Sequence, residues 1–578
     1  MLRSIRINTL FVGIRRSSTD TIKPNNPKSS QIFSEEPAVF PKPEVKNTVN
    51  LPLPLKETSM FLKLEQLQPV PESEALRKSL SFDDVPGPKY LRYFSKIWNF
   101  LPVMSTQLTA STVQYFLYAG KMFGNQLSWG NNRRFFRNLL GQYGPVVRLH
   151  GPFGGDVVIL SRAEHAAVVF ENEGRYPVRS CLDSLEKYRI QYRHFRRAGP
   201  FLMYGPEWEN LRKAMEVPLQ VVSDFQFKLM DQTSEEFVTR ILRIRNKQDE
   251  VPSDFKNEIN KWALECLCCI TLNERLGFLE PSGLSNTSEA ARALESLSGA
   301  TNALRRCESG LYMWKFFNTP SWKALVKHCD QLGFILNKHI CKIQDLLHQK
   351  KINGEPLNPK NVSFVEYLFL QDGLVPEDVL TIVLDMTLIG VNTVTHSIAF
   401  LLYNLAQNPR TQLKLYNELV KKPYKNENSI PPYLNACIKE SLRLHPPMPI
   451  LTRVLSKDIL VYNYRIPKGT YVLIDTHISS MREEYFEDAH RFKPERWLDQ
   501  EWCLDTENVC ATMPFGYGQK SCIARAIAES QIASILTKIL QAFRIEYHYG
   551  ELTSTNRLLA QPDRPLKFTF IDRIHPSN

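Results

Sequence analysis

The hydrophobic positions of this chain recur mainly at the spacing of buried helix faces, with a few short apolar runs between them. The longest helical pattern starts at Pro376, where a proline followed by two acidic residues suits a first helical turn. It extends to about Gln407 and stops before Asn408-Pro409, because the residue before a proline avoids helical geometry. The pattern predicts one helix of roughly 48 Å, which could cross a whole domain.

The remaining patterns are shorter. Val146-Val147 and residues 157–160 are short apolar runs bordered by glycine and proline, which predicts a hairpin. A helical pattern extends from Ile523 to about Phe543. Because most of the other segments also have helical spacing, we expect a mainly α fold with small β-sheets.

The middle of the long helix contains the sequence Ile389-Gly390-Val391-Asn392-Thr393. A glycine inside a helix costs about 1 kcal/mol relative to alanine. Gly390 followed by polar residues therefore indicates a functional role. The alternative is a chance glycine in a long buried helix.

The N-terminal segment has the composition of a targeting sequence. Serines and apolar residues alternate there with arginines, and no acidic residue occurs before Asp20; the arginines are Arg3, Arg6, Arg15 and Arg16. This composition predicts a mitochondrial transit peptide over residues 1–30, the alternative being an accidental basic tail. The longest apolar run, residues 10–14, is too short to span a bilayer. Residues 31–80 are proline-rich and are expected to form a disordered linker, and residues 81–578 the folded domain.

Composition narrows the function classes. Hydrophobic residues make up 43% of the 578 positions, which is too apolar for a disordered protein. The net charge is +12, but no compact basic cluster or nucleic-acid motif accompanies it, so we expect no nucleic acid partner. The 11 cysteines have no repeating spacing, which favours a reducing compartment over a disulfide framework.

Three cysteines, Cys266, Cys268 and Cys269, lie close together in an apolar stretch. They could form a metal site. A buried helix is the favoured interpretation, because free cysteine usually packs as a small hydrophobic residue.

The strongest local signal is the segment of residues 514–525, PFGYGQKSCIAR. Gly516 and Gly518 permit a tight loop, and Cys522 ends it where the helical pattern begins. A cysteine at a helix N-terminus is favoured as the thiolate, which is the form that binds soft metals. From these residues alone, metal ligation and a buried cysteine at a helix start remain equally open.

The segment from Phe515 to Ala524 resembles the haem-binding signature of the cytochrome P450 family, F-x-x-G-x-[basic]-x-C-x-[G/A]. Two further motifs follow the family's order: Glu440 and Arg443 resemble its E-x-x-R pair, and residues 494–497 resemble its P-E-R-W segment. The resemblance covers roughly residues 80–578. It implies the cytochrome P450 fold, with haem b (iron protoporphyrin IX) as cofactor and Cys522 as the ligand of its iron.

The resemblance also assigns roles in the long helix. Gly390 matches the glycine that makes room for dioxygen, and Thr393 the threonine of the proton relay. Two residues depart from the family pattern: Ile389 replaces a small residue, and Asn392 replaces an acid. An amide cannot deliver a proton as a carboxylic acid does, so the relay is altered at Asn392.

Further residues match positions at the haem. Phe515 opens the signature. Trp208 and Arg212 resemble a W-x-x-x-R pair that meets a haem propionate, and Arg453 resembles a later propionate arginine. Lys520 stands where the family usually has arginine and supplies a point charge without the bidentate fork.

Some features are similar to the mitochondrial branch of the family. They include Tyr176 to Arg179, Tyr188-Arg189, and Trp262 with Arg275. That branch takes electrons from an acidic ferredoxin, and Lys439 and Arg525 match bases used for docking. Asn435 and Ala526 replace two other such bases. The resemblance implies a location at the matrix side of the inner mitochondrial membrane.

The implied activity is hydroxylation of a lipophilic substrate with O2 and ferredoxin electrons. Members of the mitochondrial branch hydroxylate sterols, secosteroids and bile-acid precursors, so the resemblance implies a sterol or steroid substrate. Ala524 and the segment at residues 205–208 are also similar to arthropod ecdysteroid side-chain hydroxylases, but these few residues do not assign the substrate. The substrate pocket is expected between residues 176–204, 385–393, 447–451 and 558–561, which are mostly apolar. The alternative is a haem-thiolate sensor or isomerase without monooxygenase turnover.

Overall fold

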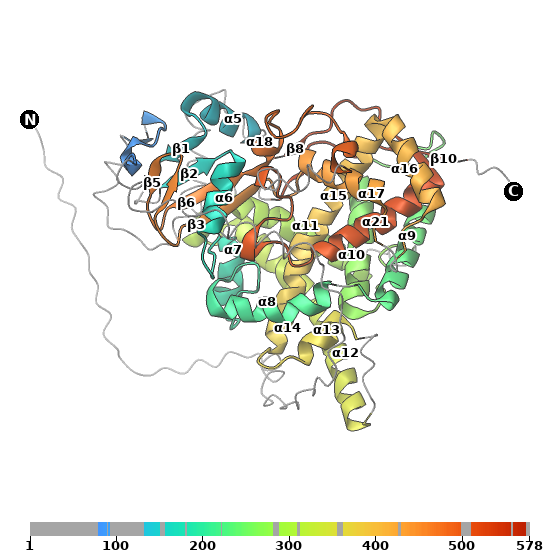
Figure 1. Ribbon diagram of the computed structural model, residues 1–578. Coiled ribbons are helices and arrows are strands. Elements are labelled where there is room, and N and C mark those ends of the chain that lie inside the picture. The colour runs from blue at the N-terminus through green and yellow to red at the C-terminus, as the bar shows by residue number, and fades with distance from the viewer. Residues whose placement is uncertain are drawn as a thin grey trace, which may run out of the picture. The chain divides into compact units, whose positions relative to one another are not determined.

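The computed structural model (Figure 1) describes residues 79–89, 91–92, 132–150, 156–179, 182–220, 222–280, 288–308, 313–354, 362–425, 429–498, 510–555 and 559–573. All described residues belong to one compact unit. The predicted transit peptide (1–30) lies outside the described residues. So does the predicted linker (31–80), apart from Ser79 and Leu80.

Helices dominate the described residues, as the apolar spacing predicted (Figure 1). The α-helices are α5 (Asn132–Tyr143), α6 (Ala163–Glu171), α7 (Asp183–Glu186), α8 (Gly205–Gln220), α9 (Asp224–Ile244), α10 (Phe255–Leu272), α11 (Glu289–Glu308), α12 (Pro320–Ile352), α13 (Phe364–Phe369), α14 (Pro376–Asp385), α15 (Val391–Gln407), α16 (Pro409–Lys421), α17 (Pro432–Leu444), α18 (Thr476–Ser480) and α21 (Arg525–Ala542). Short 3-10 or π-helical elements are η1 (Phe82–Asp84), η3 (Lys187–Tyr192), η5 (Met313–Lys315), η6 (Met386–Gly390), η7 (Pro494–Trp497) and η8 (Gly518–Lys520).

The strands form small sheets, also as predicted. The largest has the order β1-β2-β6-β3, and its strands are β1 (Val146–Leu149), β2 (Val157–Leu160), β6 (Tyr471–Asp475) and β3 (Ile450–Val454). β1 and β2 pair antiparallel, which confirms the predicted hairpin, and β2 pairs parallel with β6. The two-stranded sheets are β4 (Ile459–Val461) with β5 (Tyr464–Ile466), β7 (Phe543–Glu546) with β10 (Thr569–Asp572), and β8 (Ser554–Thr555) with β9 (Gln561–Pro562).

The predicted long helix is present as α14, η6 and α15, which together run from Pro376 to Gln407. Its central residues, Met386–Gly390, form a π-helical turn, a feature that occurs inside α-helices mainly at functional sites. By length and composition this helix could cross a membrane, but most of its apolar stretch is buried inside the protein. It is therefore a core helix, and it packs with α10 and α21 in the largest hydrophobic cluster.

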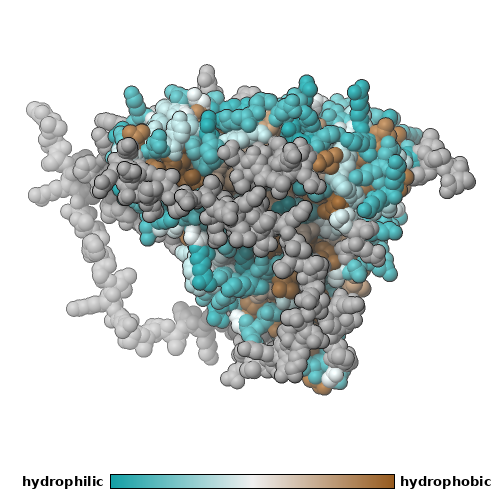
Figure 2. Space-filling model, in the orientation of Figure 1, coloured by the Kyte–Doolittle hydropathy of each residue, from teal (hydrophilic) through white to brown (hydrophobic). Residues whose placement is uncertain are grey.

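The surface and the core are clearly separated. On the face that Figure 2 shows, hydrophilic side chains predominate among the coloured residues, and hydrophobic ones form small separate groups. The fold class predicted from the sequence, mainly α with small β-sheets, is confirmed.

Candidate active site

The segment from Pro514 to Cys522, here called the cysteine loop, is closed by its own backbone. The N–H of Cys522 donates to the carbonyl oxygen of Phe515 at 2.7 Å, and that of Gly516 donates to the carbonyl oxygen of Met513 at 2.9 Å. Gly516 and Gly518 have φ values of 74° and 70°, a region that favours glycine. The two glycines therefore set the turn that presents Cys522.

The side chain of Cys522 is accessible, although protein surrounds it. Among the nine cysteines that the structure describes, it alone has an exposed side chain. Enough protein surrounds it for burial to raise the pKa of its thiol, an effect opposed by the N–H of Ala524 and the nearby cations Arg212, Arg179 and Arg525. A thiol in this setting becomes a thiolate when a soft metal cation binds it.

The helix after the cysteine loop begins later than predicted. α21 starts at Arg525, not at Ile523, and Ala524 caps it. The backbone must first turn through Ile523 and Ala524 before helical hydrogen bonds can form. Cys522 thus receives the N–H of Ala524 but lies just before the helix, and the expected lowering of its pKa by the helix end is outweighed by burial.

The predicted aromatic–cation pair on α8 lies against the cysteine loop. Trp208 is buried, and the Nζ atom of Lys520 lies 3.5 Å from the centre of its indole ring. Lys520 also donates to the carbonyl oxygen of Met203 at 2.8 Å, and Arg212 donates to that of Ser521 at 3.0 Å. The structure therefore brings Trp208, Arg212 and Lys520 together beside Cys522.

Arg453, predicted as a propionate partner, is engaged in a different way. It is buried, and its Nε donates to Glu173 Oε2 at 2.6 Å. Its Nη2 donates to the carbonyl oxygen of Tyr517 in the cysteine loop at 3.1 Å. Glu173 is a residue that sequence reasoning missed: it also accepts the N–H of Gln519 at 2.9 Å, and a Cβ atom at Gly518 would collide with it. Arg453 and Glu173 together hold the loop from one side.

Arg179 is a second residue whose position the sequence did not give. It was noted only as part of a branch-like motif, yet its charge is close enough to Cys522 to lower the pKa of the thiol. Its guanidinium donates to the carbonyl oxygen of Phe201 at 2.9 Å. The bridge between Val178 and Val454 holds this segment beside β3. That long-range pairing has no local sequence signal.

The predicted E-x-x-R pair is the centre of a buried network. Glu440 and Arg443 are both fully buried and form a bidentate pair with two contacts of 2.8 Å. Glu440 also accepts Arg496 Nε at 3.2 Å and Trp497 Nε1 at 2.9 Å, so the P-E-R-W segment joins the pair as expected. Arg443 in turn donates to the carbonyl oxygen of Ala489 at 2.7 Å. The network fastens α17 to η7 and to the segment before it.

The predicted oxygen-activating residues lie at the end of the π turn. Thr393 Oγ1 donates to the carbonyl oxygen of Gly390 at 3.0 Å. Apart from its two chain neighbours and the backbone of its own helix, no described atom lies within 4 Å of the position that a Cβ at Gly390 would take, so this side of the helix is open. Asn392 Nδ2 donates to the carbonyl oxygen of Leu388 at 2.7 Å and to Thr301 Oγ1 of α11 at 3.0 Å.

Some of the segments expected to line the substrate pocket contact one another. Asp385, at the end of α14, forms an ion pair of 2.8 Å with the fully buried Arg189 and accepts the N–H of Phe201 at 3.0 Å. The N–H of Ala560 donates to the carbonyl oxygen of Pro447 at 2.9 Å. Asp385 is therefore paired with groups of the protein itself.

The three clustered cysteines occupy α10, as the buried-helix interpretation predicted. Cys266, Cys268 and Cys269 are buried, and burial raises the pKa of each thiol, that of Cys269 to about 12. Protonated thiols are poor metal ligands. Within the described part of the chain, no group of three or more His, Cys, Asp or Glu side chains is arranged to hold a metal ion.

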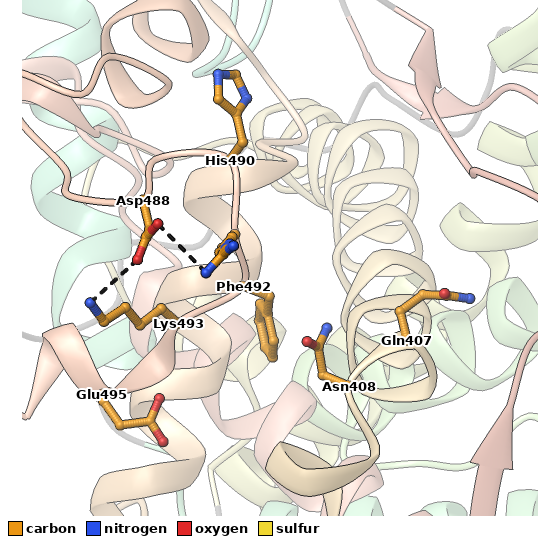
Figure 3. Close-up of a pocket in the computed structure, with 8 residues that line it drawn as sticks. Gln407, Asn408, Asp488, His490, Phe492, Lys493 and Glu495 are labelled. Atoms are coloured by element: carbon orange, nitrogen blue, oxygen red, sulfur yellow. Dashed lines mark ion pairs between the residues drawn. The ribbon is translucent and has the colours of Figure 1, made fainter.

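A hollow of about 570 Å³ lies on the surface away from these residues (Figure 3). It is lined by Gln407, Asn408, Asp488, His490, Arg491, Phe492, Lys493 and Glu495. Asp488 forms ion pairs of 3.7 Å with both Arg491 and Lys493, as the dashed lines in Figure 3 show. The hollow is polar and contains no residue of the cysteine loop, so it is not the candidate active site.

The described residues fit a haem. Cys522 offers an accessible thiol inside the protein, and Arg212, Arg179 and Lys520 supply positive charge close to it. Gly390 leaves open space on the long helix. A soft ligand with cations around it matches an iron porphyrin whose two propionates need partners.

Comparison with known proteins agrees with this geometry. The family model of cytochrome P450 matches residues 115–570. Probable cytochrome P450 49a1 of Drosophila melanogaster is 29% identical over 84% of this chain and 82% of its own. Probable cytochrome P450 12a5, mitochondrial, of the same fly is 31% identical over 74% and 84%, respectively. Rat 1,25-dihydroxyvitamin D(3) 24-hydroxylase, mitochondrial, is 28% identical over 75% and 82%. This chain therefore belongs to the cytochrome P450 family of haem b monooxygenases with a cysteine thiolate ligand, in its mitochondrial branch.

Proposed function

We propose that this protein hydroxylates a lipophilic substrate of the sterol or steroid class, using O2 and electrons from a mitochondrial ferredoxin. The observation that carries the proposal is the accessible Cys522 in a closed loop, surrounded by Trp208, Arg212 and Lys520. The similarity to a rat protein named as a vitamin D hydroxylase supports a fused-ring or secosteroid substrate. The segments expected to line the pocket are apolar, which suits such a molecule.

Each residue has a defined task in this proposal. Cys522 would hold the haem iron through its thiolate, and Lys520, Arg212 and Arg179 would supply the charges that offset the propionates. The bound haem supplies the activation of dioxygen. Thr393 holds a proton at its Oγ1 atom next to the open side of the helix, where Gly390 leaves room. Arg453, which pairs with Glu173, would keep the cysteine loop in place beside the haem.

The carbon monoxide spectrum of the reduced, haem-loaded protein tests the ligand directly. We expect a strongly red-shifted Soret band that Cys522→Ala abolishes and the control Cys510→Ala retains, because Cys510 is buried outside the loop. An unshifted band in the unmodified protein would remove Cys522 as the ligand. Where the red-shifted band is present, a second assay asks whether product formation requires ferredoxin. That requirement distinguishes a monooxygenase from a haem-thiolate sensor or isomerase.

Two bases support the docking of an acidic ferredoxin. Arg525 is exposed at the start of α21 and pairs with Glu529 at 2.9 Å. Lys439 on α17 is half-buried, with its Nζ 5.8 Å from the ring centre of Trp497. Arg525 lies on α21, which follows Cys522, and Lys439 lies on α17, which carries Glu440. Both side chains are positively charged. An acidic partner would be attracted to them, more strongly at low salt.

Exposed apolar side chains support attachment to the inner membrane surface. Phe316 and Phe317, just after η5, are 76% and 63% exposed, and Met313 is 46% exposed. Tyr192 of η3 is half exposed and lies edge-on to Trp322, which places η3 near the same end of α12. Large apolar residues gathered at one place on a surface mark a membrane or protein contact. We assign this surface, here called the η5 patch, to the matrix side of the inner membrane.

A further inference from the structure

The π turn of the long helix is fastened at both ends to elements that cover it. Before the turn, Asp385 pairs with Arg189 of η3. After the turn, Asn392 donates to Thr301 of α11. Asn392 and Thr301 lie 91 positions apart in the sequence. The shape of the π turn and the positions of its covers are therefore linked through specific polar contacts.

Both N–H groups of the Asn392 amide are used in this arrangement. One donates to the carbonyl oxygen of Leu388 on its own helix, and the other donates to Thr301 Oγ1. Thr301 is buried, and its hydroxyl donates to the carbonyl oxygen of Leu297 at 2.8 Å. The chain of donors thus runs from the long helix into α11, away from Thr393. An amide N–H is not acidic, so Asn392 can hold these two acceptors but has no proton to deliver.

We propose that Asn392 is a positioning residue that ties α11 to the π turn, and that it takes no part in proton transfer. The proposal rests on the proposed function, because it assigns a task to a residue of that site. The acid that the family usually has at this position has no N–H group and could not donate to Leu388 and Thr301 together. With Asn392, the long helix lacks the acidic proton donor of the family pattern and has a fixed contact with α11 in its place.

The test is a double-mutant cycle with Asn392→Ala, Thr301→Val and both changes together. The control is Thr271→Val on α10, because Thr271 is also buried and its hydroxyl donates only within its own helix, to Leu267 at 2.8 Å. Two quantities are measured on the ferric, haem-loaded protein. They are hydrogen exchange of the α11 amides and the rate at which 4-phenylimidazole leaves the haem, followed by absorbance.

We expect each single change to raise α11 exchange and the phenylimidazole dissociation rate roughly five-fold, the size expected for one hydrogen bond. The double variant should add nothing further, and Thr271→Val should change neither quantity. Amides of α10 and α21 should exchange as in the unmodified protein, which separates the tie from a general loss of stability. Unchanged α11 exchange in both single variants, or additive effects in the double variant, would overturn the proposal.

The tie between Asn392 and Thr301 and the proposed function can fail independently of each other. The carbon monoxide spectrum is recorded on the same samples, and a missing red-shifted band would reject the haem-thiolate assignment alone. Hydrogen exchange of α11 needs no catalysis, so it would still show whether Asn392 and Thr301 act as a pair. A third outcome also overturns the tie: a larger peroxide release per O2 consumed in Asn392→Ala that Thr301→Val does not share. That result would place Asn392 in proton transfer.

Discussion

The cysteine loop and the π turn are built differently. The loop is closed by hydrogen bonds between residues at most seven positions apart, such as Cys522 to Phe515. The π turn is held by side chains from distant segments, Arg189 and Thr301. The loop follows the family motif closely, whereas the turn departs from it at Ile389 and Asn392. The backbone closure of the loop depends on its own sequence, with Glu173 and Arg453 added from distant segments, whereas the side chains that hold the turn all come from distant segments.

The surface of α17 and α21 and the η5 patch also suit different partners. The side of α17 and α21 presents charged residues such as Arg525, which suit a soluble acidic protein. The η5 patch presents aromatic side chains, which suit lipid. Electrons and substrate would thus arrive from different surroundings. Each of the following changes tests one side of this comparison.

The largest expected effect is on the side of the cysteine loop. Glu440→Leu would leave the fully buried Arg443 without its carboxylate, and Arg496 would lose its partner as well. Breaking a buried pair in this way costs about 3–5 kcal/mol of unfolding free energy. Chemical denaturation and the haem content of the purified protein measure the effect. As a control, Asp458→Leu breaks the exposed pair with Arg465 and should cost far less.

The next effect concerns the cover of the π turn at the end of α11. Burial raises the pKa of Glu308 to about 8, and its Oε1 accepts the N–H and hydroxyl of Ser184 at 2.8 and 2.5 Å. Because the folded pKa lies above the unfolded one, this group favours folding at low pH and loses that contribution as pH rises toward 8. The loss between pH 5 and pH 8 is on the order of 3 kcal/mol.

Glu308→Gln should remove this pH dependence, because glutamine keeps an oxygen for Ser184 and carries no proton to lose. The unfolding free energy of the variant should then fall by less between these pH values than that of the unmodified protein. Denaturant titrations at both ends of the range measure it. Parallel pH profiles for the two proteins would show that Glu308 is not the titrating group.

A smaller effect is expected from a methyl group in the cysteine loop. Gly518→Ala must adopt a φ of 70° and place its Cβ against Glu173. Gly469→Ala is the matched control, since Gly469 has a φ of 82° and open space around it. Each change should cost about 1 kcal/mol for the backbone conformation, and Gly518→Ala about 1–2 kcal/mol more. Haem retention during gel filtration should fall only in Gly518→Ala; equal loss in both variants would contradict the role of Glu173.

The η5 patch is expected to affect membrane affinity and not the stability of the fold. Replacing Phe316 and Phe317 with serine removes two large apolar side chains, each worth about 1–2 kcal/mol when inserted. Flotation with anionic phospholipid vesicles should therefore weaken by ten-fold or more at unchanged stability. Phe334→Ser is the control, because Phe334 is 75% exposed but lies apart on α12. An equal loss for Phe334→Ser would mean that any exposed aromatic contributes and that the patch has no special role.

The same contrast explains what the sequence could predict. Local patterns predicted the long helix, the hairpin, the glycine loop and the Glu440–Arg443 pair, since each depends on residues close together or on one helix face. The structure was needed for Glu173, which reaches the cysteine loop from 346 positions away. The start of α21 was misjudged, because periodicity does not show that Ile523 and Ala524 must turn first.

The smallest expected effect concerns ferredoxin and is the most sensitive to conditions. Arg525→Gln removes one exposed charge near Cys522, and Lys338→Gln is its control, because Lys338 is also exposed and also pairs with a glutamate, Glu289 at 2.7 Å. Exposed charges steer association more than they hold a complex together, so the rate of ferredoxin-dependent reduction should fall about two- to five-fold at low salt. The difference should vanish near 0.5 M salt, where screening is nearly complete at contact distances. A fall of the same size in Lys338→Gln would indicate general charge attraction, and a salt-independent fall would place Arg525 in the support of the cysteine loop, through its position 5.1 Å from the ring of Phe515, rather than in docking.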